Sequence, residues 1–133
     1  MAFDQAMLKA GGDINPSRFV TLSDSRTVVE SNSGDQHVLG VSHESAKEAP
    51  QSGASTLAAE DGDPIKVYGP GDVCLVQAGG AIDVSSDAFV KPDNSGDAVA
   101  ASTSATATGI ALEDAADGEL FYIMVIPPTL TPA

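Results

Sequence analysis

Short apolar stretches alternate with turn residues along most of the chain. Segments rich in Val, Ile, Leu and Phe, bounded by Gly, Pro, Asn, Asp or Ser, are typical of β-strands. They occupy residues 18–22, 27–30, 37–41, 65–68, 73–76, 81–84, 88–91 and 120–126. Residues 98–108, nearly all Ala, Ser, Thr and Val, fit a strand or a loop. The pattern predicts an all-β fold, a small β-barrel or β-sandwich, whose last strand ends at Pro127 and Pro128.

Residues 1–16 have a different pattern. Phe3, Met7 and Ala10 have helical spacing, Gly11 begins a Gly-Gly stop signal, and Pro16 disfavours further helix. This predicts a two-turn amphipathic helix or an extended arm, which either docks on another surface or stays mobile, since so short a helix is marginal in water. The predicted organisation is therefore an N-terminal arm over residues 1–16, a β-rich domain over 17–127 and an extended tail over 128–133. Residues 42–60, rich in Ser, Ala and Gly, are expected to form a surface loop outside the core.

Two segments of the chain resemble two others. Residues 38–46 align with 107–115, and the glycine, the glutamate and the last alanine are identical. Residues 61–67 align with 117–123, and each begins with Asp-Gly followed by an acidic residue. The repeat favours a barrel or sandwich made of two related halves, in which the aligned glycines relieve crowding where strands bend.

The charge balance restricts the partners. The chain has 6 Lys plus Arg against 19 Asp plus Glu, a net charge of −13. Affinity for nucleic acid depends on basic residues that neutralise phosphates, so we expect no nucleic-acid partner, and an anionic membrane would repel the chain for the same reason. The N-terminus has no signal-peptide pattern, and the longest apolar run, residues 120–126, is far short of a membrane span. An acidic surface can instead dock on positive patches of another protein.

Catalytic and metal-binding signals are nearly absent. Cys74 lies in an apolar strand pattern with no basic residue nearby in sequence to lower its pKa. His37 and His43 match no metal-site spacing. No nucleophile, base and orienting group converge in the sequence, so we expect no enzyme, no metal and no cofactor.

Several motifs together resemble the capsid cement and lambda-type head decoration proteins of tailed bacteriophages. They are the Ala-Phe-Asp-Gln-Ala start, the Gly-Val/Ile-Ser/Ala-x-Glu-x-Ala segments, the Gly-Asp-Pro-Ile-Lys-Val strand opening and the Ala-Ala-Asp-Gly-Glu-Leu-Phe-Tyr-Ile close, and the resemblance spans roughly residues 18–126. It implies a small β-barrel-like domain of the β-tulip type that assembles as a homotrimer. Such a trimer would sit on the outer capsid surface, bind the major capsid protein and clamp the expanded shell, after synthesis in the host cytoplasm.

The arm is the predicted contact with the shell, because three arms on one trimer add avidity. The candidate capsid-contact residues are Phe3, Met7, Leu8, Ile14 and Arg18. Two alternatives stay open. One is another phage structural component, such as a tail tube, fibre base or head–tail connector. The other is a bacterial carbohydrate- or protein-binding β-module, which would normally expose aromatic side chains for stacking.

Overall fold

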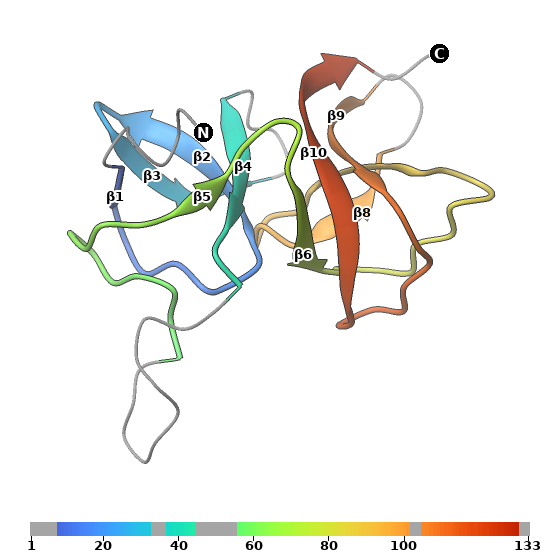
Figure 1. Ribbon diagram of the computed structural model, residues 1–133, viewed down its shortest axis with the longest axis horizontal. Coiled ribbons are helices and arrows are strands. Elements are labelled where there is room, and N and C mark those ends of the chain that lie inside the picture. Colours follow the sequence, from blue (N-terminus) through green and yellow to red (C-terminus); the bar gives the residue numbers. More distant parts are fainter. Residues whose placement is uncertain (1–7, 33–36, 45–55, 102–104, 131–133) are drawn as a thin grey trace.

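The chain forms two five-stranded β-sheets in a computed structural model that describes residues 8–32, 37–44, 56–101 and 105–130 (Figure 1). The first sheet has the order β1-β3-β2-β4-β5 and the second β6-β10-β9-β7-β8. The described residues contain no helix, which confirms the all-β prediction, and so none that could cross a lipid bilayer. The strands are β1 (Lys9–Ala10), β2 (Phe19–Asp24), β3 (Thr27–Glu30), β4 (Val38–Ser42), β5 (Val67–Tyr68), β6 (Val73–Gln77), β7 (Phe89–Pro92), β8 (Ala98–Ala100), β9 (Thr106–Ala111) and β10 (Leu120–Leu130).

The two sheets define two lobes that lie side by side in Figure 1. We call residues 8–68 the first lobe and residues 69–130 the second lobe. In the second lobe the sheet curls, and Ala78, just after β6, pairs in parallel with Ala98 of β8. This bridge connects the two edge strands of the sheet, so the second lobe is a small barrel. Inner positions alternate with outer ones along β6, β7 and residues 121–126 of β10.

The two lobes repeat one topology. In the first lobe β1 lies parallel to β3, as Ala78 lies parallel to β8 in the second. The register agrees as well, since Val20 pairs with Gly40 between β2 and β4, and Val90 with Gly109 between β7 and β9. The strand order β1-β3-β2-β4-β5 therefore corresponds to Ala78-β8-β7-β9-β10. The predicted relation between two halves of the chain is confirmed.

The aligned turns are built alike. In residues 60–63 and 116–119 the amide of the fourth residue donates to the carbonyl of the first, at 2.9 and 3.1 Å. In both turns the carboxylate of the fourth residue also accepts from the amide of the first, at 3.0 and 2.7 Å. The third residue is a glycine with φ of 87° at Gly62 and 86° at Gly118, a conformation that other residues adopt at a cost. Each turn thus leads the chain into the last strand of its lobe.

Each lobe has a buried interior, and the two meet at a shared core. The inner face of the first sheet carries its own cluster, with Leu8, Ala10, Ile14, Val20, Val28, Ala59 and Val67. A larger cluster fills the second lobe and continues into the first through Phe19, Val38 and Val41, with Tyr68 packed against it. The opposite face of the first sheet is therefore covered by the second lobe, and the lobe boundary is part of the core.

Close backbone contacts hold this boundary. The Phe19 amide donates to the Gly96 carbonyl at 2.8 Å, and the Gln77 amide donates to the Ser17 carbonyl at 3.0 Å. Gly96 has a φ of 78°, and a Cβ there would lie 2.9 Å from the Phe19 carbonyl oxygen. Only a residue without a side chain satisfies both requirements, so Gly96 allows β2 to approach the turn between β7 and β8.

Several sequence predictions need correction. Residues 81–84 form no strand, and only Ile82 pairs, with Ala115. The last strand does not end at Pro127 and Pro128 but continues to Leu130, with a register shift that takes both prolines out of the ladder with β9. Within the predicted surface loop, Ala59 is fully buried because it pairs with Ile14. Residues 45–55 of that loop lie outside the described residues.

We expect Gly96→Ala to destabilise the protein more than Gly118→Ala. Both glycines have positive φ, but a Cβ at Gly118 meets nothing within 4 Å, whereas at Gly96 it crowds the Phe19 carbonyl. Gly118→Ala therefore reports backbone strain alone, about 1 kcal/mol, and Gly96→Ala adds roughly 1–3 kcal/mol of overpacking. Urea unfolding of the two variants measures the difference. Equal losses would show that the lobe boundary does not depend on this contact.

Candidate functional site

The described part of the predicted arm is built into the first lobe. Lys9 and Ala10 form β1, so this part of the arm is extended and not helical. Leu8 and Ile14, two of the candidate contact residues, lie in the core of that lobe, and Ile14 is completely buried. Their side chains pack inside the lobe and hold the segment to the sheet. Phe3 and Met7 lie outside the described residues, and the prediction that they contact a capsid stays a prediction.

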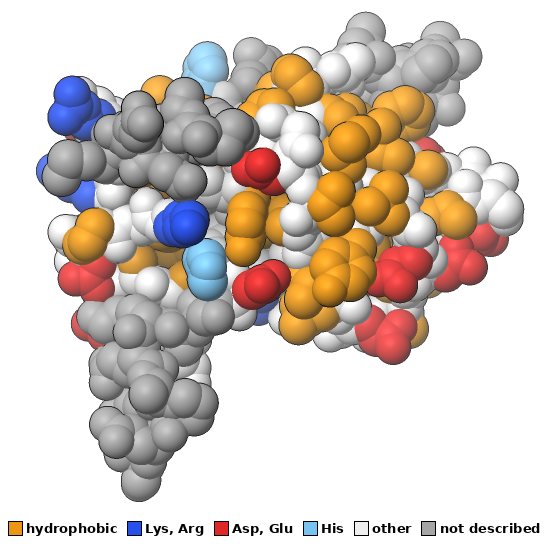
Figure 2. Space-filling view, in the orientation of Figure 1, with side chains coloured by type: hydrophobic (Ala, Val, Ile, Leu, Met, Phe, Trp, Pro, Cys, Tyr) orange, Lys and Arg blue, Asp and Glu red, His pale blue; other side chains and the backbone are white. Residues whose placement is uncertain are grey.

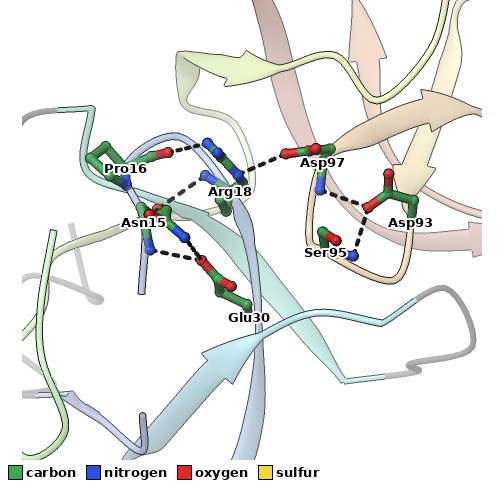
Figure 3. A network of polar contacts seen from close by, with 8 residues as sticks. Asn15, Pro16, Arg18, Glu30, Asp93, Ser95 and Asp97 are labelled. Atoms are coloured by element: carbon green, nitrogen blue, oxygen red, sulfur yellow. Dashed lines mark hydrogen bonds and ion pairs between the residues drawn. The ribbon is translucent and has the colours of Figure 1, made fainter. Parts of the chain in front are cut away.

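Arg18, the last candidate residue, lies at the boundary between the lobes (Figure 3). Its Nε atom is 2.7 Å from Asp97 Oδ1, and the two side chains are only 17% and 18% exposed. The N–H is not aligned for a hydrogen bond to this oxygen, so the contact is electrostatic. Arg18 Nη1 donates to the Pro16 carbonyl at 2.6 Å. The guanidinium thus connects the two lobes, and its charge is used mainly within the chain.

Carboxylates surround this ion pair. Burial raises the pKa of Asp97 above its ordinary value of 3.8; Arg18 opposes the shift, and the negative charges of Asp93, Glu30 and Asp117 add to it. The short contact with Arg18 by itself would lower the pKa of Asp97, whereas the pKa is raised. Because both side chains are largely withdrawn from water, burial outweighs the charge of Arg18 in setting the direction of the pKa shift, although the two groups remain paired at 2.7 Å.

The outer face of the second lobe carries the largest exposed apolar area of the view in Figure 2. Outward residues of β6, β10, β9 and β7 follow one another across the sheet, in register. One row is Val73–Met124–Ile110–Phe89, and the next joins Leu75 to Tyr122, whose carbonyl accepts from the Leu112 amide. Val73, Leu112, Leu120 and Tyr122 are each at least half exposed.

We call this surface the outer face, formed by Val73, Leu75, Phe89, Ile110, Leu112, Leu120, Tyr122 and Met124. Apolar side chains gathered in one exposed patch mark an interaction site more often than scattered ones do. The sequence analysis did not identify it. The signal was present, since β6, β9 and β10 contain no charged residue in a chain with many, and their outward positions are apolar where an exposed strand would be polar.

The described residues offer little reactive chemistry. Cys74 is buried, and burial together with the charges of Asp72 and Glu44 raises its pKa to about 12. The thiol therefore stays protonated and is a poor nucleophile. His43 stacks on Tyr68 with ring centroids 5.8 Å apart. Across the described residues, no group of three or more His, Cys, Asp or Glu side chains is placed to hold a metal ion.

A protein-family model decides what kind of molecule this is. The family is described as structural cement protein (E217 gp24/Pam3 gp6), and its model matches residues 3–126. The chain belongs to this family of phage structural cement proteins. It is therefore a structural protein that binds the phage capsid, and not an enzyme. The resemblance inferred from the sequence motifs is confirmed at this level.

Comparison with solved structures supports the fold. The chain is similar to the crystal structure of the head fiber gp8.5 N base in bacteriophage phi29, with 22% sequence identity and a TM-score of 0.55. The match covers 92% of this chain and 93% of the other. At this identity the likeness shows a shared fold and no more. No curated protein matches the sequence.

We expect Ile14→Ala to lower the free energy of unfolding by about 2–5 kcal/mol, because Ile14 is a fully buried core side chain. Deletion of residues 1–7 removes none of the described core contacts and should leave the unfolding midpoint close to that of the parent protein. Urea denaturation followed by circular dichroism measures both. A parental midpoint for Ile14→Ala would contradict the assignment of residues 8–14 to the core.

We expect part of the pH dependence of stability to come from Asp97. Its folded pKa is raised, so the folded protein holds this proton more tightly than the unfolded chain does. The stabilisation is complete below the ordinary pKa of 3.8 and is lost as the pH rises through the raised value. Asp97→Asn should therefore lose less stability than the parent between about pH 4 and neutrality.

Thermal unfolding across that pH range measures the Asp97 effect. Asp61→Asn, a change at an exposed turn of the first lobe, is the matched control for the loss of one negative charge. If both variants keep the parental slope, Asp97 does not titrate in this window.

Proposed function

We propose that the protein binds the outer surface of the capsid as a homotrimer and stabilises the expanded shell. Membership of the structural cement protein family carries this proposal, since it already establishes a capsid-binding structural role. The trimer, the outer surface and the stabilising effect on the shell are the parts that experiment has to test. Three copies held together would bind the shell through several weak contacts at once, which raises avidity without any strong single contact.

The charge of the chain supports the outer surface over the inner one. A protein with a net charge of −13 is repelled by packaged nucleic acid, which lines the inside of a filled shell. The carboxylates that are not used in turns remain available to basic patches of the major capsid protein. Contacts of this kind weaken with added salt, because salt screens charges at the surface.

In this proposal fewer residues of the arm contact the capsid than the sequence predicted. Leu8 and Ile14 are committed to the core and Arg18 to Asp97, so the capsid contact expected of the arm falls to Phe3 and Met7. Because residues 8–14 are fixed to the first sheet, they give residues 1–7 a defined point of departure. The deletion of residues 1–7 should then weaken binding to the shell without unfolding the protein.

A second candidate is the base of a head fibre. It is favoured by the shared fold with the phi29 head fiber N base, which spans nearly the whole of both chains. Both candidates place the protein on the head. They differ in whether its main effect is on the shell itself or on the attachment of an appendage.

Co-sedimentation with shells of the cognate major capsid protein tests the proposal. We expect saturable binding to expanded, DNA-free shells at a fixed ratio to capsid subunits, weaker binding to unexpanded shells, and a higher temperature of shell disruption when the protein is bound. Light scattering of the free protein should give three times the monomer mass of 13.4 kDa.

The outcomes separate the candidates. Saturable binding with no change in the temperature of disruption would favour the fibre base over the cement role. Absence of binding to either shell form would overturn both. The variant lacking residues 1–7 is the matched control for the arm, and unchanged affinity in that variant would remove Phe3 and Met7 from the contact.

A further inference from the structure

The two lobes use corresponding surfaces in different ways. In the first lobe, Phe19, Val41 and Tyr68 form one row across β2, β4 and β5. The corresponding row in the second lobe is Phe89–Ile110–Met124, part of the outer face. Both rows lie on the side of the sheet opposite its own lobe interior. The surfaces are therefore equivalent by topology and register.

Only the row of the first lobe is covered. Phe19 and Val41 are completely buried, and they join the core cluster of the second lobe, against which Tyr68 also packs. The row of the second lobe is only half-buried, and its neighbours Val73 and Tyr122 are 55% and 50% exposed. The row of the first lobe thus packs against the other lobe of the same chain. Among the described residues, the row of the second lobe has no such cover.

The covering surface is one end of a lobe. The row of the first lobe meets the second lobe at the end that carries the turn between β7 and β8, where the Phe19 amide bonds to the Gly96 carbonyl. The corresponding end of the first lobe carries the turn between β2 and β3. Gly96 corresponds there to Arg26, and both have positive φ. This end of the first lobe is open, since Leu22 is 40% exposed although its counterpart Pro92 is buried.

Charge favours a second copy of the chain at this place. Two copies that each carry −13 repel one another, and the repulsion is smallest where a surface with few charges meets one that is not acidic. The strands β6, β9 and β10 of the outer face contain no charged residue. The end of the first lobe carries two basic residues, Arg26 and Lys9, whose amide donates to the Arg26 carbonyl at 2.8 Å, and one acidic residue, Asp24.

A pair of opposite charges can also form at the edge of the contact. Within the chain, Arg18 beside the covered row pairs with Asp97 beside the Gly96 turn. In the second lobe the residue near the row is acidic, since Asp87 accepts from the Phe89 amide at 3.0 Å. Arg26 supplies the opposite sign on the turn. The contact between copies would therefore pair Asp87 of one copy with Arg26 of the other. This pair is not the equivalent of Arg18 with Asp97, whose counterparts are Ala88 and Thr27.

We propose that the outer face of the second lobe docks on the β2–β3 end of the first lobe of a neighbouring copy, at the place equivalent to the contact that joins the lobes within one chain. Because Arg26 stands where that contact has Gly96, side chains would make the contact between copies, without the close backbone approach that Gly96 allows. The inference rests on the proposed function, because it names the surface that would build the homotrimer. The contact is heterologous, with a different surface on each side, and such contacts form a ring when the rotation between copies closes and a filament when it does not. Three copies would close a ring of alternating first and second lobes.

Two variants test the two sides separately. Met124→Asp places a charge in the middle of the outer face, and the double variant Leu22→Asp with Arg26→Asp places charges on the receiving end. Val84→Asp is the matched control, since Val84 is 37% exposed, lies between β6 and β7 and is not one of the outer-face residues. Circular dichroism and thermal unfolding establish that each variant is folded.

We expect light scattering to give the monomer mass of 13.4 kDa for both test variants, at a concentration at which the parent and Val84→Asp are trimers. A mixture of the two test variants retains one intact contact, formed by the outer face of one and the receiving end of the other. It should therefore give a heterodimer and nothing larger.

Each other result has a definite reading. If the parent is a monomer at every concentration measured, the trimer proposal itself fails. If the parent is a trimer and Met124→Asp is too, the outer face is not the contact, and the trimer stands without this inference. If the receiving-end variant still assembles with itself while Met124→Asp does not, the outer face pairs with its own copy and the heterologous contact is wrong.

Discussion

The close approach of β2 to the Gly96 turn is the contact on which the arrangement of the two lobes depends. The Phe19 amide reaches the Gly96 carbonyl, and this brings Phe19 and Val41 into the core of the second lobe. The interior cluster of the first lobe is small and is made largely of aliphatic side chains. So small a core stabilises a lobe only weakly by itself. The lobe boundary therefore contributes to the stability of the whole chain, and Arg18 with Asp97 fixes its orientation.

Repetition of one topology explains features that look unrelated along the sequence. The Ala-Gly-Gly segments at residues 10–12 and 78–80 each follow the first strand position of a lobe, and Ile14 and Ile82 then pair with Ala59 and Ala115. What differs between the lobes is the surface chemistry. Four of the five described Lys and Arg residues, Lys9, Arg18, Arg26 and Lys66, lie in the first lobe, whereas the outer face of the second is uncharged along β6, β9 and β10. A duplicated fold has thus acquired two unlike surfaces.

The sequence was sufficient for local structure and for the repeat. Hairpin turns and apolar alternation placed most strands within a residue or two, because these signals act over short distances. The burial of Ile14 was not accessible, because a short apolar segment near a terminus reads as an arm until its pairing with Ala59 is known. Likewise Pro127 and Pro128 predict the end of a strand, because proline has no N–H to donate to a neighbouring strand. A register shift nevertheless lets β10 continue past them. The outer face was missed because the register of β6, β10 and β9 decides which apolar residues share a face.

Two opposing forces act between copies of this acidic chain with its apolar face. Its net charge keeps copies apart, and the outer face draws apolar surfaces together. The two effects do not oppose each other everywhere, because three of the four strands of the outer face, β6, β9 and β10, carry no charge, and β7 carries only Lys91. The carboxylates lie in the turns and loops around these strands. Several of those carboxylates are fixed by backbone amides, as Glu113 is by Tyr122 and Asp114 by Val84. Association is therefore favoured at one surface and opposed over the acidic remainder, which selects a defined assembly over general aggregation.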